Sequence, residues 1–376
     1  MAEPKSGSFG ESLTVNAIIE RGAERAVERQ RGDGSFPAGR NYTYNEAESP
    51  VKTTSRWLIT LCKAYENTGK AAFERAASDA MDYLLSANTR PGGYTFYCRD
   101  ALGKDRCNGL VGQSWPIHAL SYSTDVLGRE DGEALASALF SMHPFDDDVK
   151  LWERVETDGR VLGYDRTLNH QILFAARSTP LSEENATIRR TLLSFLDGLI
   201  SNMDVHPNGL IKHFVQPPLP KVLRTVAEKP RTYKLLANQA LSPYYSRSES
   251  RRRIERGYQT INLAALATLK ESFPSHAFWD SQPLTSAVGY VRDNVWELAR
   301  GVDAASGDGL PATSTVNILS TFGGVSTELA QELVGYDVNR ALDRESMRFD
   351  VEGMHPNDQA ALVSKFVDLP NLTVSR

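Results

Sequence analysis

The 376-residue chain lacks several features that mark common functional classes. No run of about 18 apolar residues is present, so we expect no transmembrane segment. The first twelve residues hold one lysine and no apolar core, which is not the pattern of a secretory signal. The sequence has no glycine-rich phosphate loop, no Gly-x-Ser-x-Gly elbow and no dinucleotide fingerprint. We therefore expect a soluble protein with no cofactor and no nucleic-acid partner.

Cysteine is scarce. The three cysteines Cys62, Cys98 and Cys107 cannot all pair, so they do not indicate a disulfide framework. A reducing, cytoplasmic location is the simplest expectation. Asn108 rather than a histidine follows Cys107, and Cys98 has no neighbouring histidine, so the four ligands that structural zinc requires are missing. We expect no bound metal.

Charge is nearly balanced overall, at a net −5, but it is unevenly spread. Between Lys212 and Arg256 there are eleven Lys or Arg and three Glu, so this stretch carries +8. Such a field attracts anions, although a run of charge is also typical of a solvated surface. The stretch predicts an anionic partner at a cleft rim and a possible peripheral membrane contact through residues 212–256.

Glycine-marked turns recur along the chain and divide it into similar units. They lie at Asp33-Gly34, Gly92-Gly93, Asp158-Gly159, Asn208-Gly209, Arg256-Gly257 and Asp308-Gly309. Each interval holds apolar stripes with helical spacing and has room for two helices. The repeat predicts an all-α fold, an (α/α)6 toroid of helical hairpins. We expect one domain over residues 12–367, a disordered arm over 1–11 and a C-terminal tail over 368–376.

One segment breaks the helical pattern. Apolar and polar residues alternate over 151–156 and 160–162, on either side of Thr157-Asp158-Gly159. Alternation around such a turn is typical of a β-hairpin. We therefore expect a short β-hairpin inserted into the toroid.

Two expected inner helices begin with unusually polar sequences. The first begins with Asn108-Gly109-Leu110-Val111-Gly112-Gln113-Ser114-Trp115, and the second begins with Asp165-Arg166-Thr167-Leu168-Asn169-His170-Gln171. Because loops and helix ends at the mouth of a toroid carry its site, we place a polar cleft there. His170 is the leading candidate for a general acid or base, since histidine titrates near pH 6.5. Asp165 or Glu153 would be the carboxylate partner of His170. The alternative interpretation is that His170 is a hydrogen-bonded structural histidine without a catalytic role.

Aromatic and polar side chains near these segments complete the expected cleft. Sugar rings pack on aromatic faces while their hydroxyls contact amide and guanidinium groups. The candidate substrate-binding residues are Arg56, Trp57, Tyr94, Asn108, Gln113, Trp115, His118, Trp152, Arg154 and Asn169. Each of the tryptophans could instead pack in the hydrophobic core and make no contact with a sugar.

The motifs Asn108 to Trp115 and Leu168 to Gln171 resemble the six-hairpin glycosidase-like superfamily, in particular members encoded with surface-polysaccharide and archaeal N-glycan assembly genes. That resemblance extends over residues 12–367 and implies action on carbohydrate. The superfamily includes glycoside hydrolases, unsaturated glucuronyl hydrolases, polysaccharide lyases and sugar epimerases. Asn169-His170 is also similar to the N-acetylglucosamine 2-epimerase group, which uses paired histidines, although Gln171-Ile172-Leu173-Phe174 departs from that group's Met-His-Leu-x-Glu-Ala pattern.

Three functions remain open. The first is a carbohydrate-active, glycoside hydrolase-like enzyme that acts on an anionic glycan, containing uronate or linked to a lipid phosphate, with Asp165, Glu153, Glu156 or His170 as acid and base. The second is a sugar epimerase or isomerase that uses His170 and His118. The third is a glycan-binding or assembly protein without catalysis.

Overall fold

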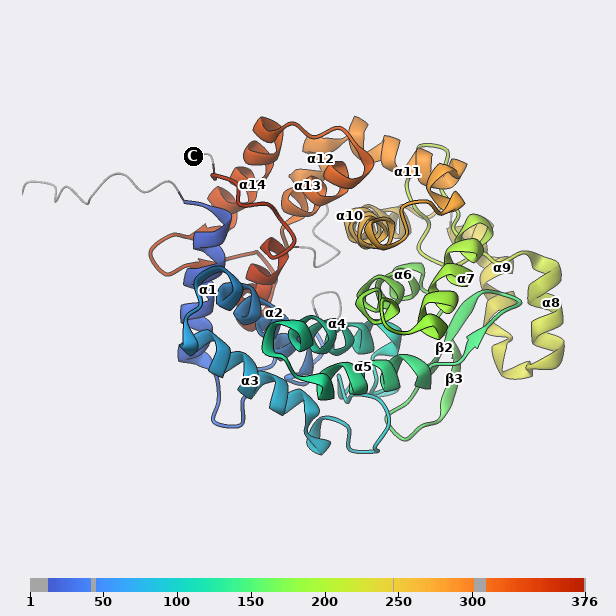
Figure 1. The fold of residues 1–376 in the computed structure, drawn as a ribbon. Coiled ribbons are helices and arrows are strands. Elements are labelled where there is room, and N and C mark those ends of the chain that lie inside the picture. The colour runs from blue at the N-terminus through green and yellow to red at the C-terminus, as the bar shows by residue number, and fades with distance from the viewer. Residues whose placement is uncertain (1–12, 42–44, 246, 301–308, 375–376) are drawn as a thin grey trace, which may run out of the picture.

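The helices form a closed ring of two layers (Figure 1). The computed structural model describes residues 13–41, 45–245, 247–300 and 309–374, so the expected arm over 1–11 lies outside the described residues. The inner layer contains α2 (Val51–Thr68), α4 (Gly109–Leu127), α6 (Leu168–Arg177), α10 (Glu249–Ser272), α13 (Pro311–Phe322) and the short α15 (Pro356–Ala360) with η6 (Ala361–Phe366). The outer layer contains α1 (Val15–Arg29), α3 (Ala71–Leu85), α5 (Glu130–Met142), α7 (Ala186–Asn202), α11 (Gln282–Asp293), α12 (Val295–Ala299) and α14 (Thr327–Ala341). The (α/α)6 toroid predicted from the sequence is confirmed.

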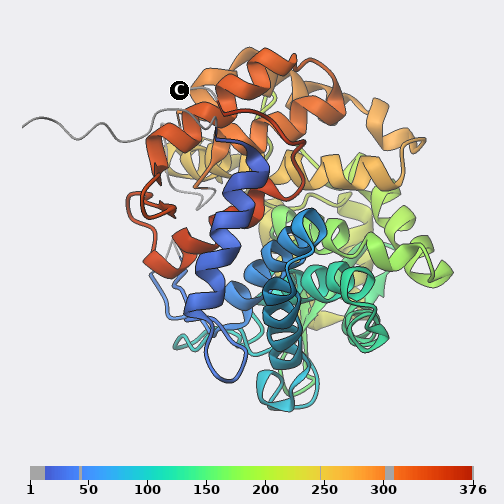
Figure 2. The ribbon, with the colours of Figure 1, turned by 60° about the vertical axis from the view of Figure 1, so that its left-hand side comes forward.

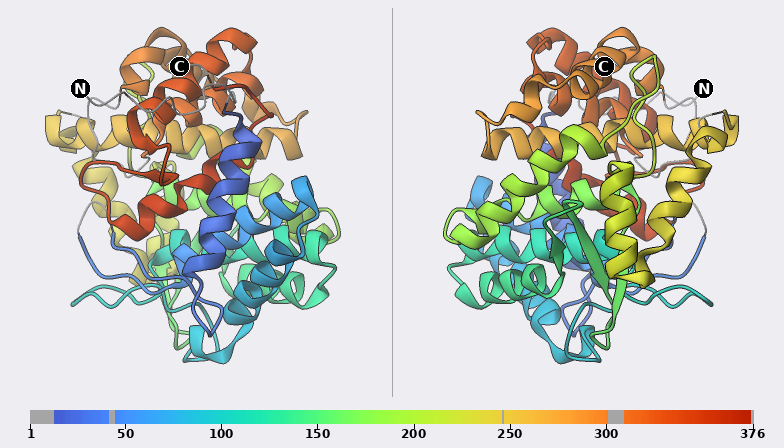
Figure 3. Two further views of the ribbon diagram at one scale, coloured as in Figure 1. Left: turned by 90° about the vertical axis from the view of Figure 1, so that its left-hand side faces the viewer. Right: turned by 90° about the vertical axis from the view of Figure 1, so that its right-hand side faces the viewer.

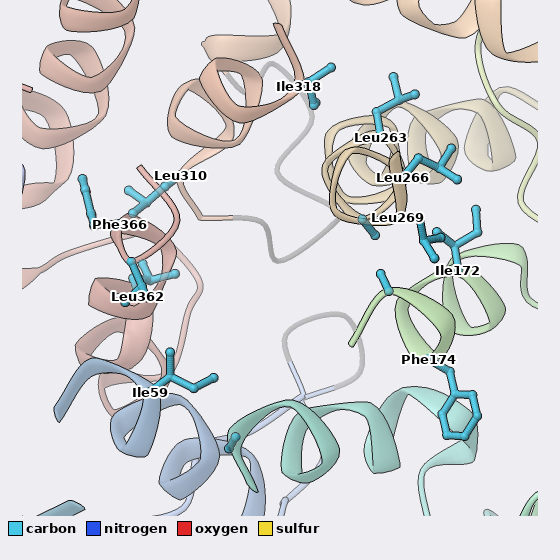
Figure 4. Close-up of a cluster of buried hydrophobic side chains, with 14 of the residues drawn as sticks. Ile59, Ile172, Phe174, Leu263, Leu266, Leu269, Leu310, Ile318, Leu362 and Phe366 are labelled. Atoms are coloured by element: carbon cyan, nitrogen blue, oxygen red, sulfur yellow. The ribbon is translucent and has the colours of Figure 1, made fainter. Parts of the chain in front are cut away.

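Apolar side chains fill the space between neighbouring helices of the ring. Figure 4 shows such side chains on several inner elements, including Ile59 of α2, Ile172 of α6 and Leu269 of α10. These three residues are at most 6% exposed. None of the helices in the described part of the chain is both long and apolar enough to cross a lipid bilayer.

Five of the six glycine turns form as expected. Their glycines have φ between +72° and +89°, which only glycine adopts without strain, and they are Gly34, Gly93, Gly159, Gly209 and Gly309. The prediction at Gly257 is wrong, because this residue lies inside α10. The sixth turn is at Gly353, with φ of +74°, directly before α15. Each of the six turns therefore precedes one inner element.

Buried glutamines fasten four inner elements to backbone groups near the turn that precedes each element. Gln113 of α4 accepts the Phe96 N–H at 2.8 Å and donates to the Phe96 carbonyl at 3.1 Å. Gln171 of α6 makes the same pair of bonds to Trp152, at 3.1 and 2.9 Å. Gln259 of α10 accepts the Ile211 N–H and donates to the Gly209 carbonyl, and Gln359 of α15 donates to the carbonyls of Val351 and Met354. An internal repeat of polar contacts thus accompanies the repeat of helices.

The expected β-hairpin is present as β2 (Leu151–Val155) and β3 (Val161–Tyr164), and β1 (Phe145–Asp146) pairs with β2 on its other side. A second pair, β4 (Leu342–Asp343) and β5 (Arg348–Phe349), follows α14. Between α7 and α10 the chain leaves the ring as α8 (Leu219–Glu228), η3 (Pro230–Thr232) and α9 (Lys234–Tyr245). These helices lie on the outside of the ring beside the hairpin (Figure 3). The remaining short helices are η1 (Ala87–Thr89), η2 (Pro180–Ser182) and η4 (Ala277–Asp280).

The two ends of the described chain close the ring. The Val15 N–H donates to the Leu372 carbonyl at 3.0 Å, and the Val374 N–H donates to the Leu13 carbonyl at 2.8 Å. Figure 2 shows α1 beside the C-terminal part of the chain. Residues 372–374, which belong to the segment that the sequence sets apart as a tail, therefore pair with residues 13–15 at the start of α1.

Asp337 of α14 gives the fold a pH-dependent contact with α13. Its fully buried carboxylate accepts the Thr313 N–H at 2.7 Å. Burial raises the pKa of Asp337 to about 6, against the opposing effects of Thr313 and Arg340. The folded chain consequently binds this proton more tightly than the unfolded chain, so the group's contribution to stability is largest below pH 4 and is lost as the pH rises towards 6.

We expect Asp337→Asn to remove this dependence, because asparagine does not ionise. The difference in free energy of unfolding between the variant and the original chain should therefore rise by about 3 kcal/mol, in favour of the variant, as the pH goes from 4 to 7. This figure comes from about 1.4 kcal/mol per pKa unit over a shift of roughly two units. Urea unfolding at half-unit pH steps measures the difference. Parallel curves for the two chains would contradict the assignment.

Candidate functional site

The inner ring encloses a cavity of about 370 Å³. Side chains from α2, α4, α6, α10, α13 and η6 line it, so every hairpin contributes to one common space. Its ionisable lining residues are Glu48, Lys52, Arg56, Arg99, His118, His170, Arg177, His213, Lys365, Asp368 and Tyr258. This is the polar cleft that the sequence indicates at the helix starts.

A histidine–carboxylate pair lies at the start of α6. His170 Nδ1 is 2.8 Å from Asp165 Oδ2. Burial would raise the pKa of Asp165, but His170 and Arg154 outweigh burial and lower it to about 2. Because the carboxylate is ionised, His170 Nδ1 is the donor, which leaves Nε2 as the ring nitrogen available to a ligand. The hydrogen bond through Nδ1 thus orients His170 so that Nε2 can act as a base.

The start of α4 holds this pair in place. Asn108 and Gly109 both adopt left-handed conformations, with φ of +56° and +60°, so the helix begins abruptly. The Leu110 N–H then donates to Asp165 Oδ2 at 3.1 Å. A Cβ added at Gly109 would lie 2.5 Å from that same oxygen. The glycine is required here because any side chain would displace the carboxylate.

A second histidine, His213, lines the same cavity. Its backbone N–H donates to Glu255 of α10 at 3.0 Å, and Glu255 also binds His206 Nε2 at 2.8 Å. Burial lowers the pKa of His213 to about 3, with further contributions from Arg251 and His170. His213 therefore stays neutral near pH 7. Its ring lies 5.5 Å from that of Tyr258, measured between centroids.

A carboxyl group just before α2, Glu48, and an aromatic ring of α4, Trp115, also line the cavity. Burial raises the pKa of Glu48, although Lys52 forms an ion pair with it. The Lys52 ammonium lies 5.5 Å from the centre of the Trp115 ring. Trp115 is only partly buried and lines the cavity, so its ring is available to pack against a sugar.

Six of the candidate residues from the sequence line the cavity: Arg56, Asn108, Trp115, His118, Asn169 and His170. Asp165 lies behind His170 as its hydrogen-bond partner. The Oδ1 atom of Asn169 is buried and has no partner among the described residues, so it can accept a hydrogen bond from a ligand.

The other candidates do not line the cavity. Trp57 and Trp152 are core residues, packed against Phe36 and against several phenylalanines respectively. The side chain of Gln113 hydrogen-bonds to backbone groups of Phe96 and Cys107. The remaining three lie on the hairpin side of the ring: Tyr94 is exposed beside Gly159, Glu153 pairs with Arg231, and Arg154 pairs with Asp105 at 2.9 Å.

None of the Lys or Arg residues of the basic stretch 212–256 lines the cavity, although His213 of the same stretch does. Several instead pair with carboxylates from elsewhere in the chain. Lys229 binds Asp146 at 2.6 Å, Arg224 binds Asp148 at 2.8 Å and Lys212 binds Asp204 at 2.6 Å. Much of the local +8 charge is therefore neutralised within the fold.

Sequence reasoning missed His213, Arg177 and Lys365. His213 follows the turn glycine Gly209 by four residues, and Arg177 follows His170 by seven, so both positions carry a periodic signal. Lys365 lies in the 3₁₀ segment η6, which no periodicity marks. Cys62, Cys98 and Cys107 are buried and unpaired, and no group of three potential metal ligands occurs in the part of the chain described here.

Comparison with known proteins agrees with this architecture. No family model matches the sequence. Among solved structures, a D-mannose isomerase superposes with a TM-score of 0.59 at 13% identity, over 94% of this chain and 96% of the other. An unsaturated glucuronyl hydrolase specific for heparin superposes with a TM-score of 0.56 at 10% identity, over 94% and 95%. At these identities the likeness shows the fold of the six-hairpin glycosidase-like enzymes.

One curated relative is much more similar in sequence. The archaeal glycosylation protein Q of Haloferax volcanii is 41% identical over 284 residues, which cover 74% of this chain and 76% of the relative. Identity at this level over three quarters of both chains shows common descent. The chain therefore belongs to the family of archaeal glycosylation protein Q.

Proposed function

We propose that the protein is a carbohydrate-active enzyme that performs acid/base chemistry on an anionic saccharide, with His170 as the reacting base. The observation that carries this proposal is the His170–Asp165 pair, which directs one ring nitrogen into a cavity that also offers Trp115 and Asn169. A role in glycan assembly agrees with the name of the related glycosylation protein.

The anionic substrate is supported by the cavity rather than by the basic stretch. Five Lys or Arg and two carboxylates line the cavity, namely Lys52, Arg56, Arg99, Arg177 and Lys365 against Glu48 and Asp368. Two of these cations also pair with carboxylates outside the lining, Lys52 with Asp358 at 2.8 Å and Arg99 with Asp105 at 3.0 Å. A cavity with an excess of cations favours a ligand that carries negative charge. Contact of residues 212–256 with a membrane surface and a cytoplasmic location stay predictions.

Two reactions are compatible with this site. Glycosidic cleavage needs an acid and a base or nucleophile on either side of one bond. Glu48 is the candidate acid, because its raised pKa favours the protonated form. Epimerisation or isomerisation is favoured by a different observation: His213, whose pKa burial lowers to about 3, is a second imidazole in the cavity beside His170. The sequence indicates His170 and His118 for this reaction, and His118, which also lines the cavity, contacts Arg177 at 3.0 Å.

Incubation of the protein with uronate-containing saccharides in D₂O distinguishes the reactions. We expect either deuterium on a sugar carbon, detected by NMR, or a new reducing end without carbon-bound deuterium. The first outcome assigns proton transfer at carbon, and the second assigns hydrolysis. His170→Gln should abolish whichever signal is seen. Binding of these saccharides without either product would contradict catalysis and favour a glycan-binding role.

A further inference from the structure

The helical pair α8–α9 carries an unusual share of the exposed apolar side chains. Five of the ten large apolar side chains that are exposed in the described part of the chain lie between residues 219 and 244. They are between 43% and 72% exposed and comprise Leu219, Leu223, Tyr233, Leu241 and Tyr244. Single exposed apolar side chains are ordinary, whereas a concentration of them marks an interaction surface.

α8 buries one part of its apolar face and exposes another. Leu219 and Leu223 are four residues apart, so they lie on the same face of the helix, and both are exposed. Val222, beside them, is fully buried in the core. Lys221 and Arg224 lie on the opposite face of α8. The helix is therefore amphipathic, and its apolar face is wider than the contact with the ring requires.

A second exposed apolar stripe runs along α9. Tyr233, directly before this helix, already has helical φ and ψ. Leu241 and Tyr244 follow it by eight and eleven residues, a spacing that places the three side chains on one face. Leu235 and Asn238, on a different face, are buried. The pair thus packs on the outside of the ring through one side and leaves apolar side chains exposed on another (Figure 3).

The cations of this pair fall into two groups. Three of them hold the pair to the ring: Lys229 and Arg224 make the ion pairs given above, and Arg231 binds Glu153 at 3.1 Å. The other three form no ion pair with any described residue and are Lys221, Lys234 and Arg247. The one acidic residue between positions 219 and 247 is Glu228. The surface that remains for a partner is therefore apolar and positively charged.

This combination is complementary to a membrane that carries negative charge. Apolar side chains of such a helix enter the boundary between lipid headgroups and acyl chains, while Lys and Arg are attracted to anionic headgroups. Tyrosine suits the same boundary, because its ring is apolar and its hydroxyl is polar. A second copy of the chain fits less well, since a symmetric contact would bring the same cations together.

We infer that the exposed face of α8–α9 docks the protein on the surface of a membrane that contains anionic lipids. The sequence predicts a possible membrane contact somewhere in 212–256 from charge alone. The exposed apolar side chains narrow this contact to residues 219–247. The inference does not rest on the reaction proposed above, because no residue of α8 or α9 lines the cavity. Membrane binding and turnover can therefore be measured separately.

Sedimentation of the intact chain with lipid vesicles tests this inference. One set of vesicles contains equal parts of phosphatidylglycerol and phosphatidylcholine, and the other contains phosphatidylcholine alone. We expect at least about tenfold tighter binding to the anionic vesicles, since each Lys or Arg near such a surface contributes a factor of about five. Binding should weaken from about 0.1 M to about 1 M salt, because the Debye length falls from about 10 Å to about 3 Å.

Two double variants separate the apolar contribution from the charge. Leu223→Ser with Tyr244→Ser keeps every cation and should weaken binding to the anionic vesicles by at least about tenfold. Lys221→Ser with Lys234→Ser keeps the apolar side chains and should lower the preference for anionic vesicles by a similar factor. The matched control is Val27→Ser on α1, which removes an exposed apolar side chain elsewhere on the ring and should leave binding unchanged.

Thermal unfolding of each variant confirms that it is folded. The inference is wrong if the intact chain binds anionic vesicles no more tightly than neutral ones. It is also wrong if the Leu223→Ser, Tyr244→Ser variant binds as the intact chain does, or if Val27→Ser weakens binding equally. A dimer that dissociates in the Leu223→Ser, Tyr244→Ser variant would assign this face to a second copy of the chain and would likewise overturn the inference.

Discussion

Replacing His170 with glutamine should lower kcat/KM on the saccharide substrate by about 10²–10⁴-fold, the range that general acid–base catalysis contributes. Glutamine keeps a polar side chain of similar length but cannot accept and return a proton. Asp165→Asn should cause a loss of about the same order, because an amide can donate to Nδ1 and so place the proton on Nε2. Initial rates at several substrate concentrations separate this effect from binding.

The matched control for these variants is His276→Gln. His276 lies outside the cavity, where its Nδ1 accepts the Phe278 N–H at 3.1 Å as a helix cap. Loss of a cap costs about 1 kcal/mol of stability and should leave the rate unchanged. Full activity of His170→Gln would rule out this histidine as the base and would direct attention to His213.

Gln171→Leu should produce the largest loss of stability among the polar contacts discussed. Leucine has nearly the same size but leaves two buried backbone groups without their hydrogen-bond partner, the N–H of Trp152 and the carbonyl of Asp165, and it removes one of the two donors to the Trp152 carbonyl. Each buried unsatisfied group costs about 1–3 kcal/mol, so we expect a loss of about 2–5 kcal/mol in the free energy of unfolding. Urea unfolding followed by tryptophan fluorescence measures it.

The control is Gln282→Leu at an exposed position, where the side chain makes one surface hydrogen bond to Ser286. Its effect should stay within about 0.5 kcal/mol. Because Gln171 also holds the Asp165 backbone, the variant should lose activity even under conditions in which it remains folded. A loss below about 1 kcal/mol would mean that other groups bind the Trp152 N–H and the Asp165 carbonyl in the variant, contrary to this account.

The fold was predictable from the sequence because its signals are local. Glycine turns and apolar spacing depend on neighbouring residues, which is why five turns and the β-hairpin are confirmed. Gly257 shows the limit of this reasoning, since a glycine in a helix and a glycine in a turn look alike when tertiary packing decides. The turn at Gly353 was missed because the helix that follows it, α15, has five residues, which is too short for a helical apolar pattern to be recognised in the sequence.

The candidate site was harder to predict because a polar residue at a helix start has two uses. Gln113 and His170 occupy similar places in the sequence, yet Gln113 turns back to its own backbone while His170 faces the cavity. The two outcomes differ only in how the helix starts pack against the rest of the fold, and this packing cannot be read from the local sequence. Lys365 and Arg177 lie far apart along the chain, so no local pattern relates them.

The seam between residues 13–15 and 372–374 has a consequence for how the chain is made. The contacts of Gln113 and Gln171 join residues that lie close in the sequence, so they can form as soon as those segments leave the ribosome. The first residue of α1 differs, because the Val15 N–H donates to Leu372 near the other end of the described chain. During synthesis the protein is therefore an open arc, and it becomes a ring only when residues 372–374 arrive.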